Sequence, residues 1–285
     1  MKTKKLPIYY ALFFFFSVVS CDTLDINDAN LNELSTAEVV QGLKKALEIG
    51  TDTATNTLSL TNGYYGNALL KIPLPDEAEM VRQQIVNITN QVPALQSVFD
   101  LDAQFENVVL SINRAAEEAA AEAKPIFADA ITGLSFSQGM DILYGINPAD
   151  SLKSDGFDST AATGYFKVVT FDALQNLYAP KIDAQLNKDL GLGFSANQAW
   201  STLRNAVNNS LNQIEGNIIT NALYEKSGYT VNRIEQESLG LFATERALNG
   251  LFSKVGDEEK KIRRNPYEWA VDIIQRVFGS VMKNI

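Results

Sequence analysis

The 285-residue sequence contains no histidine and only one cysteine, Cys21. The absence of histidine excludes Ser-His-Asp and Cys-His catalysis, histidine-ligated zinc and imidazole acid–base chemistry. One cysteine cannot form a disulfide within the chain. Any catalysis would have to rest on carboxylates, lysine, tyrosine or serine, and we expect neither a metal nor another cofactor.

Basic residues are also scarce, since 24 Lys and Arg stand against 34 Asp and Glu and give a net charge of −10 at pH 7. Nucleic-acid binding depends on basic side chains that neutralise phosphates. We therefore expect no nucleic-acid partner. With 46% hydrophobic and 20% charged residues, the chain has the composition of a globular protein.

The longest apolar run lies at the N-terminus, from Leu6 to Val19, and follows Lys2, Lys4 and Lys5. A positive start before a short apolar core is typical of a secretory signal peptide. As a helix this run would span about 21 Å, which is short of the roughly 30 Å of a bilayer core. We interpret it as a signal that is removed after residue 20, which would leave a net charge of −13.

The run ends in Val18-Val19-Ser20-Cys21, with a branched apolar residue three positions before the cysteine and a small residue directly before it. This pattern resembles the lipobox of bacterial lipoproteins. The resemblance implies acylation of the Cys21 sulfur, with fatty acids such as palmitate, and cleavage ahead of Cys21. We expect this lipid to anchor the protein in a cell-envelope membrane, preferably the outer one, with the domain in the periplasm or at the cell surface. The alternative is an ordinary signal peptide with a cysteine at its cleavage point.

After the cysteine, residues 21–35 are interpreted as a short acidic tether. From residue 36 onward apolar residues recur every three or four positions, as in amphipathic helices, and no segment alternates for long. Ser35 and Glu38 form a capping box that predicts a helix start. Pro125 predicts a kink or an end in one helix, and Pro180 a disturbance in another. The sequence thus predicts one all-α, bundle-like domain over residues 36–285.

Several stretches, in the same order, resemble a bacterial family known as domain of unknown function 4197. The resemblance covers nearly all of residues 36–279 and implies no reaction, ligand or catalytic residue. It is carried by Gly42-Leu-Lys-Lys-Ala-Leu47, Ile72-Pro-Leu-Pro75, Asn113-Arg-Ala-Ala-Glu117, Glu122-Ala-Lys-Pro-Ile-Phe127, Asp129-Ala-Ile131, Ala162-Thr-Gly-Tyr-Phe166, Leu248-Asn-Gly-Leu-Phe252 and the stretch from Glu258 through Asn265-Pro266 to Gly279.

One polar cluster could carry chemistry: Asn113, Arg114 and Glu117, with Asp129 further along. Glu117 or Glu118 together with Asp129 would resemble the paired carboxylates of a glycosidase. The alternative, which we favour, is structural: Asn113, Arg114 and Glu117 bond to the segment at Pro125, whose freed carbonyls need donors.

Two other segments allow two interpretations each. Tyr64-Tyr65 lies between glycines ahead of Ile72-Pro-Leu-Pro75, so this loop either contacts a ligand or partner or plugs one end of the helical bundle. The charged stretch 257–264 is either a docking patch or, as we favour, a solvated helix face with Asp257–Lys261 and Glu259–Arg263 pairs.

These observations lead to two hypotheses about function. The first is a non-enzymatic envelope lipoprotein, anchored through Cys21, that binds or scaffolds a partner protein or an apolar ligand. The alternative is a carboxylate-dependent hydrolase acting on envelope polymers, which rests only on the cluster around Glu117. A fold that places two carboxylates face to face would favour the hydrolase, whereas an apolar groove would favour the binding module.

Overall fold

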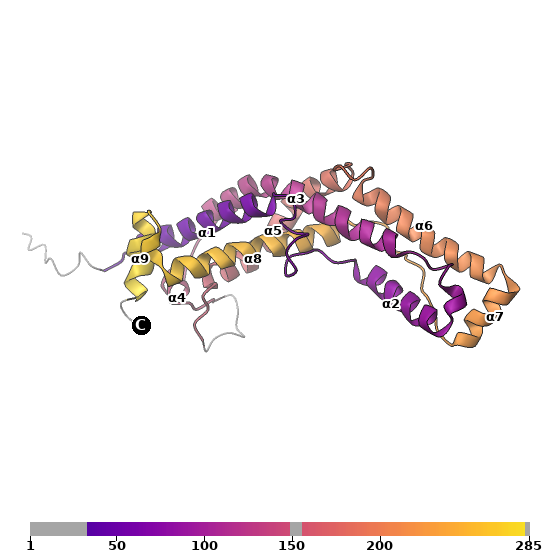
Figure 1. Ribbon diagram of the computed structural model, residues 1–285. Helices are drawn as coiled ribbons and strands as arrows, with labels where there is room; N and C mark the ends of the chain where they lie inside the picture. Colours follow the sequence, from indigo (N-terminus) through magenta and orange to yellow (C-terminus); the bar gives the residue numbers. More distant parts are fainter. Residues whose placement is uncertain (1–32, 149–155, 283–285) are drawn as a thin grey trace, which may run out of the picture. The chain divides into compact units, whose positions relative to one another are not determined.

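The computed structural model describes residues 33–148 and 156–282, and residues 34–285 form one compact unit (Figure 1). The signal peptide, Cys21 and nearly all of the tether lie outside the described residues. The described part of the chain is helical and has no strand, which confirms the all-α prediction. Its helices are α1 (Thr36–Leu58), α2 (Asp76–Gln91), α3 (Asp102–Gly133), α4 (Gly139–Leu143), α5 (Ala161–Leu186), α6 (Ala196–Glu215), α7 (Ile218–Ser227), α8 (Gly240–Arg264) and α9 (Asp272–Met282), with short 3-10 turns at Pro93–Leu95 and Pro266–Glu268.

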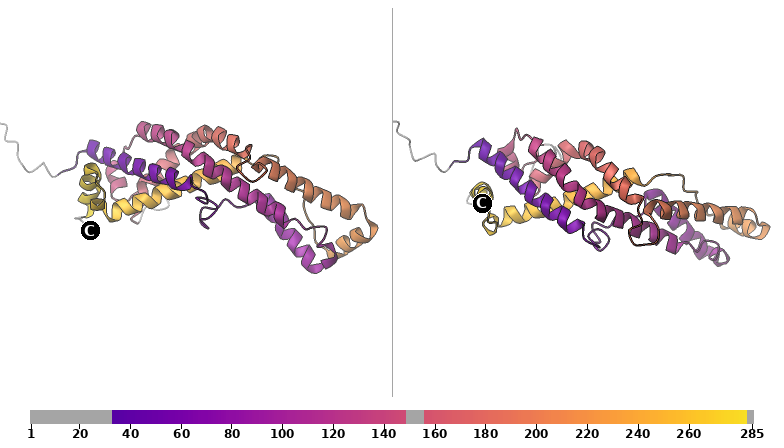
Figure 2. Two further views of the ribbon diagram at one scale, coloured as in Figure 1. Left: turned by 45° about the horizontal axis from the view of Figure 1, so that its top comes forward. Right: turned by 90° about the horizontal axis from the view of Figure 1, so that it is seen from above.

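The long helix α3 is shared by two groups of helices. It packs against α1, α5 and α8 in one group and against α6 in the other, and α1 and α5 both pack against α8. Figure 2 shows this arrangement from two further sides. Helix α9 packs on α1, α4 and α8, and α7 on α2 and α6. Among the described residues, no helix is both long and apolar enough to cross a membrane.

Helix α1 forms as its sequence predicts. The Ser35 hydroxyl accepts a hydrogen bond from the Glu38 N–H, and the Glu38 carboxylate accepts one from the Ser35 N–H, so both halves of the capping box are present. The two bonds satisfy backbone donors that a helix start otherwise leaves open. The apolar residues at helical spacing face inward and are fully buried: Val39, Leu43, Leu47, Ala54 and Leu58.

Neither internal proline ends its helix, since α3 continues past Pro125 to Gly133 and α5 past Pro180 to Leu186. A proline frees the carbonyl four residues before it. These carbonyls belong to Ala121 and Asn176, and both residues are exposed. Both helices thus carry their proline at the surface, where water can approach the backbone.

Apolar residues recur at helical spacing from Trp200 to Ile218 and predict one helix there. They do not lie on one helix, because α6 ends before Gly216. Ile218 then begins α7 and is 90% exposed. The chain after α7 runs without helix from Tyr229 to Glu237. Side chains of two helices bond this segment: Glu77 of α2 accepts from the N–H groups of residues 235 and 236 (both 2.8 Å), and Trp200 of α6 donates to the carbonyl of residue 236 (3.0 Å).

The charged stretch 257–264 is not a wholly solvated face, because Glu259 and Arg263 are buried. The Glu259 carboxylate accepts hydrogen bonds from the N–H groups of Ala162 (3.0 Å) and Thr163 (2.7 Å) and from the Thr163 hydroxyl (2.6 Å). It caps the start of α5, where a helix has open N–H groups and a positive dipole end. The predicted Glu259–Arg263 pair is present at 2.7 Å.

Arg263 binds the C-terminal end of a helix, where carbonyl groups are open. Its guanidinium donates to the carbonyls of Ile142 (2.8 Å) and Leu143 (2.7 Å), the last residues of α4. The Asp257–Lys261 pair is replaced, since Lys260 lies 3.3 Å from Asp257 and Lys261 lies 2.6 Å from Glu258. One buried ion pair of α8 thus joins the end of α4 to the start of α5.

We predict that Arg263→Met lowers the free energy of unfolding by about 3–5 kcal/mol, because it leaves Glu259 buried without its counter-ion. Adding Glu259→Gln to this variant should cost less than the two single losses combined, since the two side chains are in contact. Arg264→Met is the matched control, because Arg264 is exposed and its loss should change stability by no more than about 0.5 kcal/mol. Urea unfolding followed by circular dichroism measures all four, and equal effects at 263 and 264 would contradict this role.

Candidate functional site

The polar cluster of α3 binds the loop formed by residues 59–75 rather than the segment at Pro125. The Asn113 side chain accepts from the Ile72 N–H (2.8 Å) and donates to the carbonyls of Ile72 (2.8 Å) and Val109 (2.7 Å). Asn113 is fully buried. Its amide therefore satisfies both backbone groups of a buried loop residue, as a neighbouring strand would.

One turn further along α3, Glu117 holds the same loop. One of its carboxylate oxygens accepts from the N–H groups of Tyr64 (3.1 Å) and Tyr65 (2.9 Å). The other oxygen pairs with Arg114, which also donates to the Asn62 side chain (2.9 Å). The structural interpretation named the wrong segment as the partner of these side chains. They bond the loop formed by residues 59–75, called the tyrosine loop below, whereas exposed Pro125 needs no such support.

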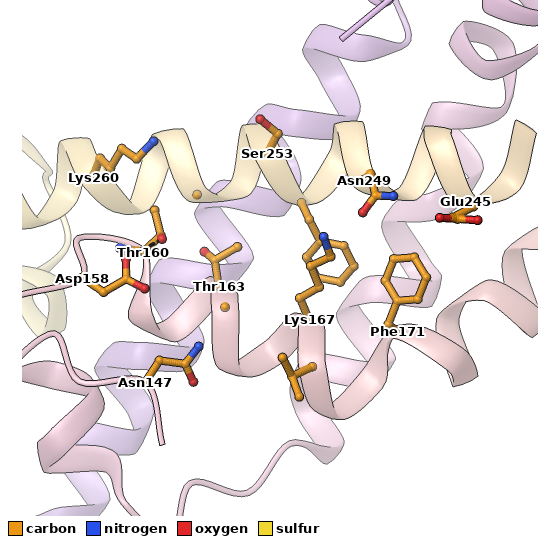
Figure 3. A pocket seen from close by; sticks show the side chains of 14 residues that line it. Asn147, Asp158, Thr160, Thr163, Lys167, Phe171, Glu245, Asn249, Ser253 and Lys260 are labelled. Carbon is orange, nitrogen blue, oxygen red and sulfur yellow. Dashed lines mark hydrogen bonds between the residues drawn. The ribbon is translucent and has the colours of Figure 1, made fainter. Parts of the chain in front are cut away.

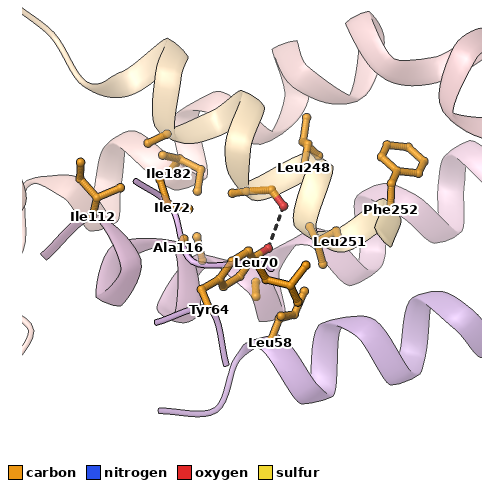
Figure 4. Packing of buried hydrophobic residues seen from close by; sticks show 14 of the residues in the cluster. Leu58, Tyr64, Leu70, Ile72, Ile112, Ala116, Ile182, Leu248, Leu251 and Phe252 are labelled. Atoms are coloured by element: carbon orange, nitrogen blue, oxygen red, sulfur yellow. Dashed lines mark hydrogen bonds between the residues drawn. The ribbon is translucent and has the colours of Figure 1, made fainter. Parts of the chain in front are cut away.

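Tyr64 packs in the core where this loop meets α8 (Figure 4). Its hydroxyl donates to the Ala247 carbonyl (2.7 Å). Burial raises the pKa of Tyr64 well above its usual value, so the hydroxyl stays protonated as a donor. A Cβ added at Gly250 would lie 2.5 Å from the Tyr64 ring, so the close approach requires glycine. Tyr65 is half-buried, with the Lys71 ammonium 4.2 Å from its ring centroid.

The remaining carboxylates of the cluster do not face Glu117. Because α3 is helical through Pro125, Asp129 lies 12 residues beyond Glu117, which is about 18 Å along the axis. Paired glycosidase carboxylates lie only about 5–9.5 Å apart. Asp129 and Glu118 are both exposed, whereas Glu117 is buried. The structure therefore joins Asn113, Arg114 and Glu117 into one site and leaves Asp129 outside it.

A groove between α5 and α8 forms a second candidate site, which sequence reasoning missed (Figure 3). Its volume is about 720 Å³. The helices approach closely at one end, where a Cβ added at Gly256 would lie 3.2 Å from the Thr160 side chain. Helix α5 contributes Lys167, Val168 and Phe171 to the groove, and α8 contributes Glu245, Asn249, Phe252, Ser253 and Lys260.

The two aromatic side chains that line the groove, Phe171 and Phe252, form its floor, and Phe252 also contacts Phe127 and Phe166. The ring centroid of Phe252 lies 5.2 Å from that of Phe127, 5.5 Å from that of Phe166 and 6.2 Å from that of Phe171. Phe127, Phe166 and Phe252 are buried, and Phe171 is half-buried. Aromatic groups at these separations attract one another and pack rigidly. Phe252 therefore belongs to the core, and Phe171 packs against it.

Lys167 extends over this floor toward α8 (Figure 3). Its ammonium lies 5.6 Å from the ring centroid of Phe171 and 6.0 Å from that of Phe252. Burial lowers the pKa of Lys167 below its usual value, and the nearby charge of Glu245 acts in the opposite direction. Within the described part of the chain, no carboxylate lies within ion-pair distance of Lys167.

The polar residues beside Lys167 on α8 are Asn249 and Ser253, one turn apart. Neither side chain hydrogen-bonds another described residue, so both can bond solvent or a ligand. The described residues contain no group of three or more Asp, Glu, His or Cys side chains that could hold a metal. The sequence does carry one signal for this site, a lysine inside the stretch Tyr165–Phe171, which is apolar apart from Lys167 and Thr170. A single lysine does not predict a groove.

A family model described as "Protein of unknown function (DUF4197)" matches residues 33–279 of the chain. No curated protein and no solved structure was found to match the chain. The matched range includes the polar cluster of α3, the tyrosine loop and both walls of the α5–α8 groove.

We predict that Asn113→Ala and Glu117→Gln both destabilise the fold, by about 1–3 kcal/mol for each buried group left without a partner. Glu118→Gln is the matched control on the next, exposed residue of α3, and should be neutral within about 0.5 kcal/mol. Thermal unfolding of the three variants tests this. Catalytic residues are usually held at some cost to stability, so a Glu117→Gln variant as stable as wild type would contradict the structural role.

Proposed function

We propose that this chain, which belongs to the DUF4197 family, is a non-enzymatic binding protein that a lipid on Cys21 anchors in the cell envelope. The α5–α8 groove carries the binding part of this proposal, because it combines a rigid aromatic floor with polar side chains that have no partner among the described residues. The lipobox-like Val18-Val19-Ser20-Cys21 carries the anchor.

The dimensions of the groove support a small ligand. Small-molecule sites have volumes of about 300–1,000 Å³. The groove falls in this range at about 720 Å³. A small ligand with an apolar part that contacts Val168, Phe171 and Phe252 fits it better than a partner protein does. A protein interface needs a wide surface, typically about 800 Å² on each side.

The geometry of α3 weighs against the alternative of a carboxylate-dependent hydrolase. Both oxygens of Glu117 are engaged, one with two backbone N–H groups and the other with Arg114. A general acid or nucleophile needs an oxygen that can reach the substrate. The site that motivated the hydrolase holds a loop in place.

The proposed location is the bacterial envelope, with the outer membrane preferred and the domain in the periplasm or at the surface. A diacylglyceryl group plus a further acyl chain holds a protein far more firmly than one chain does, because each buried CH₂ contributes about 0.8 kcal/mol. The ligand of the groove would then come from the envelope itself.

We predict that the chain expressed in a bacterium with lipoprotein processing incorporates radiolabelled palmitate, and that Cys21→Ala abolishes the label and leaves the precursor uncut. Asp22→Ala is the matched control and should be labelled like wild type. The measurement is autoradiography of the immunoprecipitated protein. Since Cys21 is the only cysteine, label on the Cys21→Ala variant would contradict the anchor.

A further inference from the structure

We infer that the α5–α8 groove binds an amphipathic monoanion: one carboxylate or sulfonate head that pairs with Lys167 and an aliphatic or aromatic tail that lies along Phe171 and Val168. This inference rests on the proposed binding function and adds the chemical class of the ligand. It follows from three features of the groove: its cation, its apolar wall and the distribution of the other charges.

Lys167 is a groove cation that pairs with no carboxylate among the described residues. Its ammonium lies over the rings of Phe171 and Phe252 and has no carboxylate within ion-pair distance in the described part of the chain. Partial burial makes a charged group costly unless an opposite charge approaches it. A bound anion would offset that cost, and an ammonium–carboxylate hydrogen bond is about twice as strong as a neutral one.

The other charges at the groove select a single negative charge. Lys260 already lies 3.3 Å from Asp257. Asp158 accepts from the Thr160 N–H (2.8 Å) and hydroxyl (2.6 Å). Glu245 stands on α8 near Lys167, at an exposed position. Glu245 repels any anion near Lys167, and the one positive charge of Lys167 balances one negative charge but not two.

Neutral groups on both helices complete the fit. Asn249 lies beside Lys167 in Figure 3 and can donate to a second head-group oxygen. On α5, Val168 directly follows Lys167 and is 59% exposed, and Phe171 lies about one turn further along the helix. An apolar tail that leaves the head at Lys167 would cover these two side chains and remove them from water.

The test uses isothermal titration calorimetry on residues 22–285, which keeps every described residue and omits Cys21 with its competing acyl chains. The probes are decanoate, decan-1-ol and decyltrimethylammonium, each below its solubility and micelle limits. We expect decanoate to bind at least about tenfold more tightly than decan-1-ol, as one charge-assisted hydrogen bond implies. Decyltrimethylammonium should bind most weakly.

The variants assign this preference to Lys167. Lys167→Met should reduce decanoate affinity about tenfold and leave decan-1-ol binding unchanged, whereas Lys167→Arg should keep the preference for the anion. Lys181→Met is the matched control on α5, because Lys181 lies outside the groove and pairs with Glu122 at 3.0 Å. Glu245→Gln should strengthen decanoate binding. Circular dichroism checks that each variant is folded.

The outcomes separate the inference from the proposed function. Equal binding of all three probes would overturn the inference and indicate a groove that does not select by charge. An anion preference that survives Lys167→Met would also overturn it and indicate that the anion binds at a different site. If none of the three probes binds, the inference and the proposed small-ligand function both fail.

Discussion

The carboxylate of Glu259 accepts three hydrogen bonds at the start of α5 while its own helix, α8, forms the opposite wall of the groove. Glu259 is 1% exposed, and its charge is balanced by Arg263 and by the dipole of α5. This contact at Ala162 and Thr163 fixes where α5 begins relative to α8. Thr163 lies one turn before Lys167. The aromatic floor, the position of the Lys167 ammonium and the close approach at Gly256 all depend on that position of α5.

The polar cluster of α3 performs a similar task on the other side of the core. Asn113 and Glu117 hydrogen-bond the backbone groups of a loop that has no regular structure of its own. Tyr64 of that loop then hydrogen-bonds α8 through its hydroxyl. Buried polar residues are therefore used in this fold to hold irregular backbone and helix ends. The groove differs, because the polar side chains of Lys167, Asn249 and Ser253 make no hydrogen bond or ion pair with another residue in the described part of the chain. That difference is why the proposed binding site lies there and not at Glu117.

Sequence reasoning predicted the parts of this fold that local patterns determine. The Ser35–Glu38 capping box and the inward stripe of α1 follow from spacing alone, and the prediction of an all-α chain is confirmed. It failed where the outcome depends on residues distant in sequence. An i,i+4 pair such as Glu259–Arg263 has the same spacing on an exposed and on a buried face. Likewise, the residues around Lys167 do not show that α8, some 80 residues later in the sequence, lies opposite it. The effect of a proline in a helix depends on whether the carbonyl that it frees is exposed to solvent.

The central claim is that the α5–α8 groove is where this domain binds its ligand. The most direct measurement is the change in backbone amide chemical shifts of the ¹⁵N-labelled domain during titration with decanoate. The account predicts that the largest changes lie in residues 163–171 of α5 and 245–256 of α8. Changes centred elsewhere, for example on the exposed Ile218 and Ile219 of α7 or on the loop around Tyr65, would contradict it.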